Sequence, residues 1–297
     1  NTELEKQYLL DTIDAEINDK RTYATIRCKD VMCAEELCSI KKYGYREDAM
    51  KITPESAAKA YEELLRTARV EIMFEGCGDP TLAKDIFAQK FAGVKREPIV
   101  LSRSLVKAQQ GAVKEETERM DVKQGKLVMG FRVEGIEDYR RMNMARITFA
   151  LFGGTANSLL FKNVREKMSL CYYCSSGYDR SNSIMMVSSG VEAENAQKAR
   201  DEVLHQLEML KNGEFTDREL EETKLFIRTA LMATSDSLGA MDSWYLAQTV
   251  GGSEVSPDME IELSAQVSRE DVIWVANHTH LDTVYMLMPN ENQKEAE

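Results

Sequence analysis

Hydrophobic residues recur at helical spacing through the first third of the chain. Thr53 and Pro54 start a helix there, because threonine caps helices and proline is tolerated in the first turn. A strand is predicted over residues 69–75 and another helix over residues 81–91. Two further helices are predicted between residues 3 and 43, where the apolar positions are Leu4, Tyr8, Leu9, Ile13, Ile17, Tyr23, Ile26, Val31, Leu37 and Ile40.

The rest of the chain changes from alternating to helical patterning. Residues 117–122 and 126–133 alternate around Lys123-Gln124-Gly125 and predict a β-hairpin. Asp138 caps a helix that runs to Phe152, and a second hairpin is predicted from 171–178 and 184–191. Helices follow over 194–211, 216–234, 237–250, 258–267 and 269–280, before a strand at 284–288. This order predicts an α+β fold, an antiparallel β-sheet with helices packed on one face.

Pattern and length together predict about two domains. The stretch from Gly93 to Glu116 has mixed charge and weak periodicity, and it is the best linker candidate. Residues 1–92 are interpreted as the C-terminal part of a first α/β domain and residues 117–297 as a complete second domain. The linker covers residues 93–116.

The segment from Gly153 to Cys174 has the pattern of a glycine turn, a helix, a tight turn and a strand. Asn157 or Ser158 can cap the helix, whose apolar positions are Leu159, Leu160, Val164 and Met168. Arg165 then lies in the last helical turn, and Tyr172 lies early in a strand that returns past the helix end. A cation and a phenol can therefore face the same space.

The run from Asn157 to Tyr172, Asn-Ser-Leu-Leu-Phe-x-x-Val-Arg-Glu-Lys-x-Ser-Leu-x-Tyr, resembles the second-domain signature of the insulinase/pitrilysin/processing-peptidase family of zinc metallopeptidases, the inverzincins. It is most similar to the short bacterial, paired-subunit branch. An isolated Arg/Tyr pair is usually structural, but a match of this length reverses those odds. The resemblance implies processing-peptidase-like domains, and it implies that Arg165 and Tyr172 bind the backbone of a peptide substrate beside the zinc.

An inverzincin binds zinc through H-x-x-E-H on one helix and a distant glutamate as third ligand. Residues 3–17 resemble the helix that carries this glutamate and place Glu16 at the third-ligand position, although Leu9 replaces a second acid. Glu16 also suits an exposed face of an amphipathic helix. The sequence has three histidines, His205, His278 and His280, and none of them belongs to an H-x-x-E-H motif. The resemblance implies zinc in the intact family enzyme and none bound to this chain alone.

Two groups of cysteines could have functions other than peptide binding, or none beyond packing. Cys171 and Cys174 form a C-x-x-C motif that can bind metal or exchange disulfides, although it lies along a predicted strand and not at a helix start. Cys28, Cys33 and Cys38 are five residues apart, which spreads them around a helix. We interpret these three as thiols that pack between helices.

Composition narrows the function further. The 297-residue chain is 43% hydrophobic, with a formal net charge of −12 and no dense Lys/Arg block, which argues against nucleic acid and anionic membranes as partners. No run approaches eighteen apolar residues and no signal peptide opens the sequence. Six cysteines are too few for a disulfide scaffold of this size. These features predict a cytoplasmic protein.

Three functions stay open at this point. The first is the C-terminal portion of a zinc peptidase, which binds and orients a peptide in an enclosed chamber but is not catalytic by itself; the start at Asn1 hints at a partial polypeptide. The second is a non-catalytic partner subunit of a heterodimeric zinc peptidase. In either case a homologous zinc-motif subunit or a missing N-terminal portion is the expected partner. The third is a thiol or structural-zinc protein that uses Cys171 and Cys174.

Overall fold

The computed structural model describes residues 2–100 and 111–290. Its first two helices, α1 (Thr2–Ala15) and α2 (Lys20–Met32), confirm the two helices predicted before residue 43. A short 3₁₀ turn, Glu16–Asn18, separates them. The side chain of Asp19 caps α2 by accepting hydrogen bonds from the backbone N–H groups of Arg21 and Thr22, which is why a new helix starts there.

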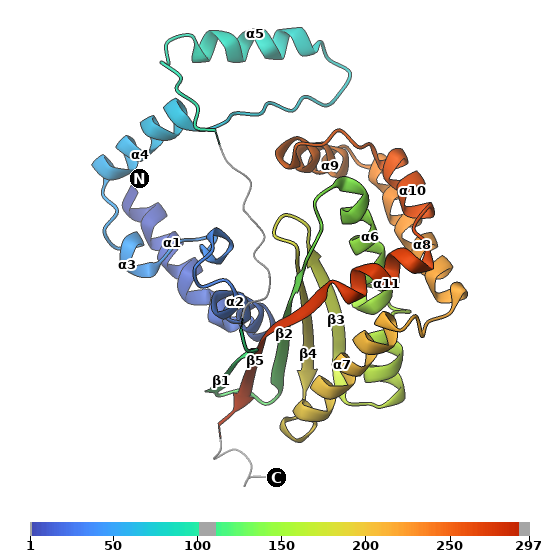
Figure 1. The fold of residues 1–297 in the computed structure, drawn as a ribbon. Helices are drawn as coiled ribbons and strands as arrows, with labels where there is room; N and C mark the ends of the chain where they lie inside the picture. The colour runs from blue at the N-terminus through green and yellow to red at the C-terminus, as the bar shows by residue number, and fades with distance from the viewer. Residues whose placement is uncertain (1, 101–110, 291–297) are drawn as a thin grey trace.

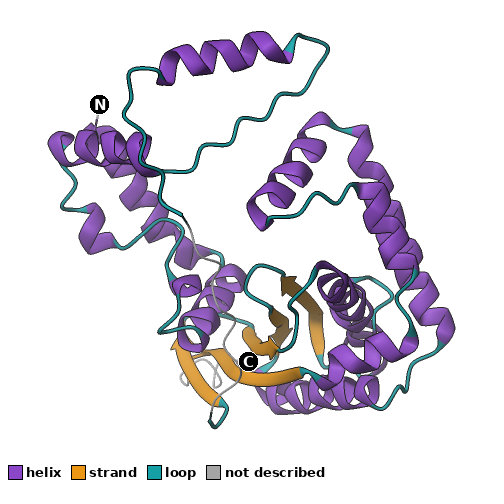
Figure 2. Ribbon diagram, turned by 45° about the horizontal axis from the view of Figure 1, so that its top comes forward, coloured by secondary structure: helices purple, strands orange, loops and turns teal. Residues whose placement is uncertain are grey.

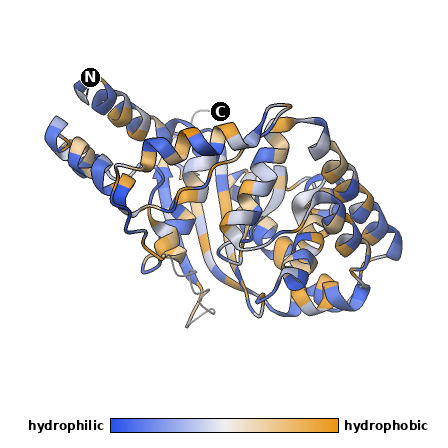
Figure 3. Cartoon of the chain, turned by 90° about the horizontal axis from the view of Figure 1, so that it is seen from above, coloured by the Kyte–Doolittle hydropathy of each residue, from blue (hydrophilic) through white to orange (hydrophobic). Residues whose placement is uncertain are grey.

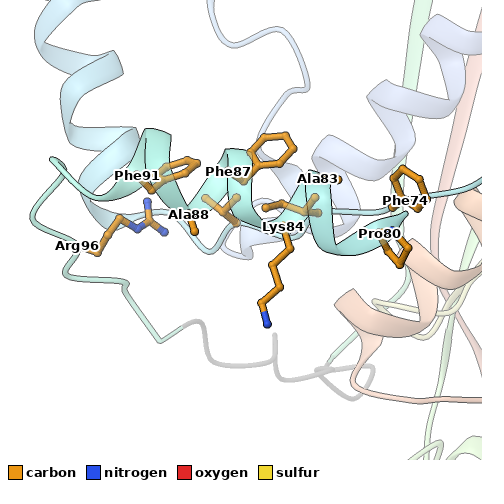
Figure 4. Close-up of a pocket in the computed structure, with 10 residues that line it drawn as sticks. Phe74, Pro80, Ala83, Lys84, Phe87, Ala88, Phe91 and Arg96 are labelled. Atoms are coloured by element: carbon orange, nitrogen blue, oxygen red, sulfur yellow. The ribbon is translucent and has the colours of Figure 1, made fainter. Parts of the chain in front are cut away.

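The next helices are α3 (Arg46–Ala49), α4 (Pro54–Thr67) and α5 (Pro80–Phe91). Thr53 caps α4 as predicted, through reciprocal hydrogen bonds with Ser56. The strand predicted over residues 69–75 is wrong, because no described strand pairs with this extended segment and an isolated strand leaves its backbone groups unpaired. Its apolar side chains instead line a groove of about 560 Å³ against α5, visible in Figure 4.

Five strands form one sheet in the order β1-β5-β2-β4-β3 (Figure 1). Their bounds are β1 (Lys114–Met120), β2 (Gly125–Val133), β3 (Cys171–Asp179), β4 (Ile184–Val191) and β5 (Thr279–Pro289). The hairpin predicted from 171–178 and 184–191 is confirmed by the antiparallel β3–β4 pair. The side chain of Asp179 accepts hydrogen bonds from two backbone N–H groups of its turn.

The first predicted hairpin is wrong, because β5 lies between β1 and β2. β1 runs parallel to β5, whereas the other strand pairs are antiparallel. Burial explains why β5, and not β1, pairs with β2. β1 is charged and largely exposed, which suits a sheet edge, while β5 is mostly buried. β1 also begins inside the stretch predicted as a linker, of which residues 101–110 lie outside the described residues. The division into two domains stays a prediction.

Helices cover one face of the sheet, which confirms the α+β architecture (Figures 1 and 2). α6 (Tyr139–Phe149), α7 (Ala196–Lys211) and α11 (Arg269–Asn277) contact the strands, and α8 (Asp217–Met232) and α10 (Pro257–Ala265) pack against α6. Helix α9 (Leu238–Gly251) follows α8 and lies beyond the end of the strands in Figure 1. The main core lies between these helices and the sheet and contains Met129, Phe131, Leu151, Leu160 and Val284. In Figure 3 the strands carry long hydrophobic stretches, whereas the surrounding helices alternate between hydrophobic and hydrophilic positions. No helix in the described ranges has the length and apolarity needed to cross a bilayer.

Helix α2 covers part of the opposite face, which the sequence did not predict. Ala24 and Cys28 of α2 pack against Val128, Tyr285 and Leu287 of the sheet. In Figure 1 the helix lies beside β5 and β2, the strands that it contacts most. The N-terminal segment and the sheet therefore share a core.

A buried ion triad strengthens this contact. Arg132 on β2 is 4% exposed, and its guanidinium donates hydrogen bonds to Glu36 Oε1 at 2.5 Å and to Asp282 Oδ2 at 2.8 Å. It also donates to the carbonyl of Met32, the last residue of α2, at 3.0 Å. Burial by itself would lower the pKa of Arg132, but the two carboxylates outweigh burial and raise it. Arg132 thereby fastens the end of α2 to β2 and β5.

Candidate functional site

Wide helical turns hold the segment that carries Arg165. The π-helical turns η3 (Ala150–Gly154) and η4 (Phe161–Lys167) replace the regular helices that the pattern predicts. Gly153 is required here, because a Cβ at this position would lie 2.7 Å from the backbone nitrogen of Ser176 on β3. The close approach places η3 directly against the strand that follows η4. Of the four predicted apolar positions of the second helix, three are buried, and Met168 is 46% exposed.

Arg165 lies in the last turn of η4, as predicted. The guanidinium carbon lies 4.7 Å from the centre of the Phe161 ring, and Nε lies 3.7 Å from Glu166 Oε1. The side chain is 40% exposed. An arginine held this loosely can exchange its surface partners for a ligand.

Tyr172 is the second residue of β3, also as predicted, and is 61% exposed. Its hydroxyl donates a hydrogen bond to Glu192 Oε1 at 2.8 Å, and this contact raises the pKa of Tyr172. A backbone hydrogen bond connects the segments that carry Arg165 and Tyr172. The N–H of Leu170, just before β3, donates to the carbonyl of Val164 in η4 at 3.1 Å. Arg165 and Tyr172 thus lie at adjoining ends of η4 and β3, each with its own surface partner. That they act on one ligand stays a prediction.

A β-bulge at Tyr172 changes which side chains share a face. Cys171 pairs with Val191 and Tyr173 with Gly190, so Tyr172 is the extra residue of the bulge. In a regular strand Cys171 and Cys174 would point to opposite faces. Here both pack against the helix-covered core, while the Tyr173 ring lies 4.2 Å from the guanidinium carbon of Arg21 on α2.

The two thiols interact, and Arg165 contributes to their electrostatics. A hydrogen bond from Cys174 is the main cause that lowers the pKa of Cys171 to about 7, and the Ser189 hydroxyl and the charge of Arg165 act in the same direction. The same contact raises the pKa of Cys174. The guanidinium therefore lies close enough to influence the residue next to Tyr172.

With this geometry in hand, comparison with known proteins identifies the family. A model described as the peptidase M16 inactive domain matches residues 51–225, more than half of the chain. The chain belongs to the peptidase M16 inactive-domain family. This confirms the resemblance found in the run from Asn157 to Tyr172.

The chain is also similar to individual proteins. A probable inactive metalloprotease, YmfF, of Bacillus subtilis (strain 168) is 28% identical over 97% of this chain and 67% of its own length. An uncharacterized zinc protease of Rickettsia bellii (strain RML369-C) is 25% identical over 53% of the chain and 39% of its own length. A conserved protein from Enterococcus faecalis V583 has the same fold, with a TM-score of 0.87 at 23% identity, over 97% of this chain and 68% of that one. The similar proteins thus include a probable inactive metalloprotease and an uncharacterized zinc protease.

The zinc of M16 proteases was expected to involve Glu16. Glu16 is half-buried on the turn between α1 and α2 and lines a cavity of about 200 Å³ with Asp30 and Cys38. Within the described residues, the His, Cys, Asp and Glu side chains whose ligand atoms gather closely enough for a metal are Cys33, Glu36 and Cys38. Among the described residues, no group of metal ligands therefore includes Glu16. The role of Glu16 as a zinc ligand stays a prediction.

Cys33 and Cys38 lie close together, although their spacing predicts thiols on different sides of one helix. Cys28 lies on α2 but packs against the sheet and not between helices, and the interpretation of Cys33 and Cys38 as thiols spread around the same helix is also wrong. Helix α2 ends at Met32, and the chain turns back immediately. The sequence signal for this arrangement was the C-x-x-E-x-C spacing after the helix.

Alkylation should detect the lowered pKa of Cys171. Because the thiolate is the reactive form, the labelling rate of Cys171 by iodoacetamide should reach half its maximum near pH 7, as measured by mass spectrometry of the digested protein. In a Cys174→Ala variant the hydrogen bond is lost, and the midpoint should move to higher pH. Identical midpoints in the two proteins would contradict the thiol contact.

Proposed function

We propose that this chain is the C-terminal portion of an M16-family protein that binds and orients a peptide in an enclosed chamber and is not catalytic by itself. The observation that carries the proposal is the exposed pair Arg165 and Tyr172 on adjoining ends of η4 and β3. It occurs in a chain that matches the M16 inactive domain. The chamber itself would be completed by the zinc-bearing part of the protein.

The chemistry of the pair suits a peptide backbone. The guanidinium of Arg165 is cationic and presents several N–H donors, so it can bind a substrate carbonyl and the oxyanion that forms from it. Tyr172 can donate its hydroxyl proton to the same peptide once the hydroxyl leaves Glu192. β3 is an edge strand of the described sheet, so an extended peptide can also add to it through backbone hydrogen bonds.

Catalysis needs a group that these residues do not supply. A zinc ion bound in the intact protein would supply this chemistry, because a zinc-bound water has a pKa of about 7 where free water has about 15.7. The described residues of this chain orient the peptide and stabilise charge on its carbonyl. We propose that the zinc and the general base come from a homologous zinc-motif subunit or from an N-terminal portion of the same protein, with Glu16 as third ligand.

A second proposal is that the whole protein is a non-catalytic partner subunit of a heterodimeric zinc peptidase. The Bacillus relative, which matches 97% of the chain, is described as probably inactive. Leu9 also replaces an acid in the segment that resembles the zinc-binding helix. The two proposals share the roles of Arg165 and Tyr172 and differ in where the zinc motif lies.

A third proposal, a thiol or structural-zinc protein built on Cys171 and Cys174, has weaker support. The bulge brings the two thiols together, but two thiols alone do not complete a structural zinc site.

The six free cysteines support a reducing, cytoplasmic location.

A peptide assay tests the first two proposals. The chain alone should not hydrolyse a mixed peptide library, because its sequence lacks the H-x-x-E-H zinc motif, but it should bind a labelled peptide in an anisotropy titration. Tyr172→Phe should weaken that binding about 3- to 10-fold, as expected for one lost hydrogen bond. Tyr61→Phe, at an equally exposed tyrosine of α4, should leave it unchanged.

Adding components then separates the two proposals. If the full-length protein hydrolyses the library and a chelator stops it, the zinc motif lies in the same protein. If hydrolysis appears only after a zinc-motif homologue from the same source is added, the protein is the partner subunit. Chelator-sensitive hydrolysis by the 297-residue chain alone would overturn both.

A further inference from the structure

The turn after α2 brings two thiols and a carboxylate together. Cys33 follows the last residue of α2, and the backbone N–H of Glu36 donates to the Cys33 carbonyl at 2.8 Å. The N–H of Ser39 then donates to the carbonyl of Glu36 at 3.0 Å. These two tight turns place the ligand atoms of Cys33, Glu36 and Cys38 within 4.8 Å of one another.

We propose that Cys33, Glu36 and Cys38 bind a divalent metal ion of the zinc type, as a site separate from the M16 catalytic zinc. Two thiolates and one carboxylate form a donor set that zinc accepts, with a water molecule as fourth ligand. In a tetrahedron, zinc–sulfur bonds of about 2.3 Å and a zinc–oxygen bond of about 2.1 Å place the two sulfurs about 3.8 Å apart and each sulfur about 3.5 Å from the oxygen. Because the three ligand atoms lie within 4.8 Å of one another, each distance needs to shorten by at most about 1.3 Å. Each thiol releases its proton to water as the metal binds.

The surroundings of Glu36 suit a metal ligand. Both of its carboxylate oxygens accept hydrogen bonds from Arg132, at 2.5 and 3.2 Å, and carboxylate ligands are normally oriented by such outer partners. Arg132 is in turn held by Asp282. Because one dication replaces two thiol protons, the total charge of the group stays the same. The ion triad therefore does not need to be rebuilt when the metal binds.

A path from solvent leads to the site. Cys33 is fully buried, but Cys38 lines the cavity of about 200 Å³ on the outer side. Its other charged lining residues include Glu16, Asp30, Lys29 and Lys41, with Lys29 paired to Asp179 and Lys41 to Asp30. A metal can thus reach Cys38 first and then bind Glu36 and the thiol of Cys33.

The bound metal would act on the fold and not on a peptide bond. The turn that carries the ligands connects α2, which covers the second face of the sheet, with Glu36 of the ion triad. A metal at this point would hold the end of α2, the turn and β2 together. The expected role is structural: it fixes the N-terminal segment on the sheet.

Cobalt titration of the full-length protein, reduced with a phosphine, tests the proposal. Cobalt(II) bound to thiolates gives an intense near-ultraviolet charge-transfer band, which a histidine and carboxylate site does not give. The wild type should develop this band with one thiolate-bound cobalt ion per chain, in addition to any cobalt at a catalytic site, and zinc should displace it. Cys38→Ser and Glu36→Gln should each weaken cobalt binding at least 10-fold, the range for a lost ligand or outer partner in metal sites.

Matched variants keep the result interpretable. Cys77→Ser, at an exposed cysteine, and the double variant Cys171→Ser/Cys174→Ser should keep both the band and the stoichiometry. Circular dichroism checks that each variant is folded, and Cys38 is preferred to the fully buried Cys33 for that reason. A folded wild type without a thiolate band, or a band that only the Cys171/Cys174 variant removes, would overturn the proposal.

Discussion

Replacing Arg132 with alanine should lower the free energy of unfolding by about 3–5 kcal/mol, the cost of breaking a buried ion pair by removing one partner. The change would leave Glu36 and Asp282 buried without their cation, and these side chains are 12% and 6% exposed. It would also remove the hydrogen bond to the last carbonyl of α2. Urea denaturation followed by circular dichroism measures the loss.

Two comparisons identify the cause of that loss. Arg218→Ala removes an exposed helical pair with Glu222 and should cost no more than about 0.5 kcal/mol. Adding Glu36→Gln and Asp282→Asn to an Arg132→Met variant removes the unpaired charges and should restore part of the stability. A loss below about 1 kcal/mol for Arg132→Ala would mean that water replaces the guanidinium and that the triad does not fasten α2.

The second large effect concerns Arg165. In the assembled zinc-containing protein, Arg165→Ala should reduce kcat for peptide hydrolysis about 100-fold, the usual effect of removing one donor that stabilises the transition-state oxyanion. The fold should not change, because the side chain is 40% exposed and its partners are the adjacent Glu166 and the Phe161 ring. Steady-state kinetics with a fluorogenic peptide measures kcat and KM separately.

Conservative and remote variants sharpen this test. Arg165→Lys keeps the charge but loses the planar set of donors, so it should recover only part of the rate. Arg218→Ala should retain full activity. If Arg165→Ala raises KM and leaves kcat unchanged, Arg165 contributes binding alone. Unchanged kcat and KM would remove Arg165 from the site.

Local sequence patterns were sufficient for the elements that depend on neighbouring residues. Thr53 caps α4 as predicted, and Thr216, the first residue of the helix predicted over 216–234, caps α8. Both do so through reciprocal hydrogen bonds with the residue three positions later. The β3–β4 hairpin and the positions of Arg165 and Tyr172 follow from the same kind of local signal. Caps and turns are decided within a few residues, so one sequence is enough to place them.

Contacts between distant segments could not be predicted in this way. The sequence of β1 and β2 suggested a hairpin, but the more apolar β5 takes the place between them. The pairing of Arg132 with Glu36 joins residues 96 positions apart. The position of α2 on the second face likewise depends on side chains of the distant strands β2 and β5.

The cysteines show most clearly which features the sequence determines and which depend on the tertiary structure. The sequence determined an α+β chain of the M16 family, with an Arg/Tyr pair at a helix–strand junction, because these features rest on local periodicity and on one continuous motif. Only the tertiary structure decided that a bulge turns Cys171 and Cys174 to one face, and that Cys33 and Cys38 meet at Glu36. A bulge shifts side-chain direction by one residue, and a helix end is set by what packs against it, so neither can be read from spacing alone.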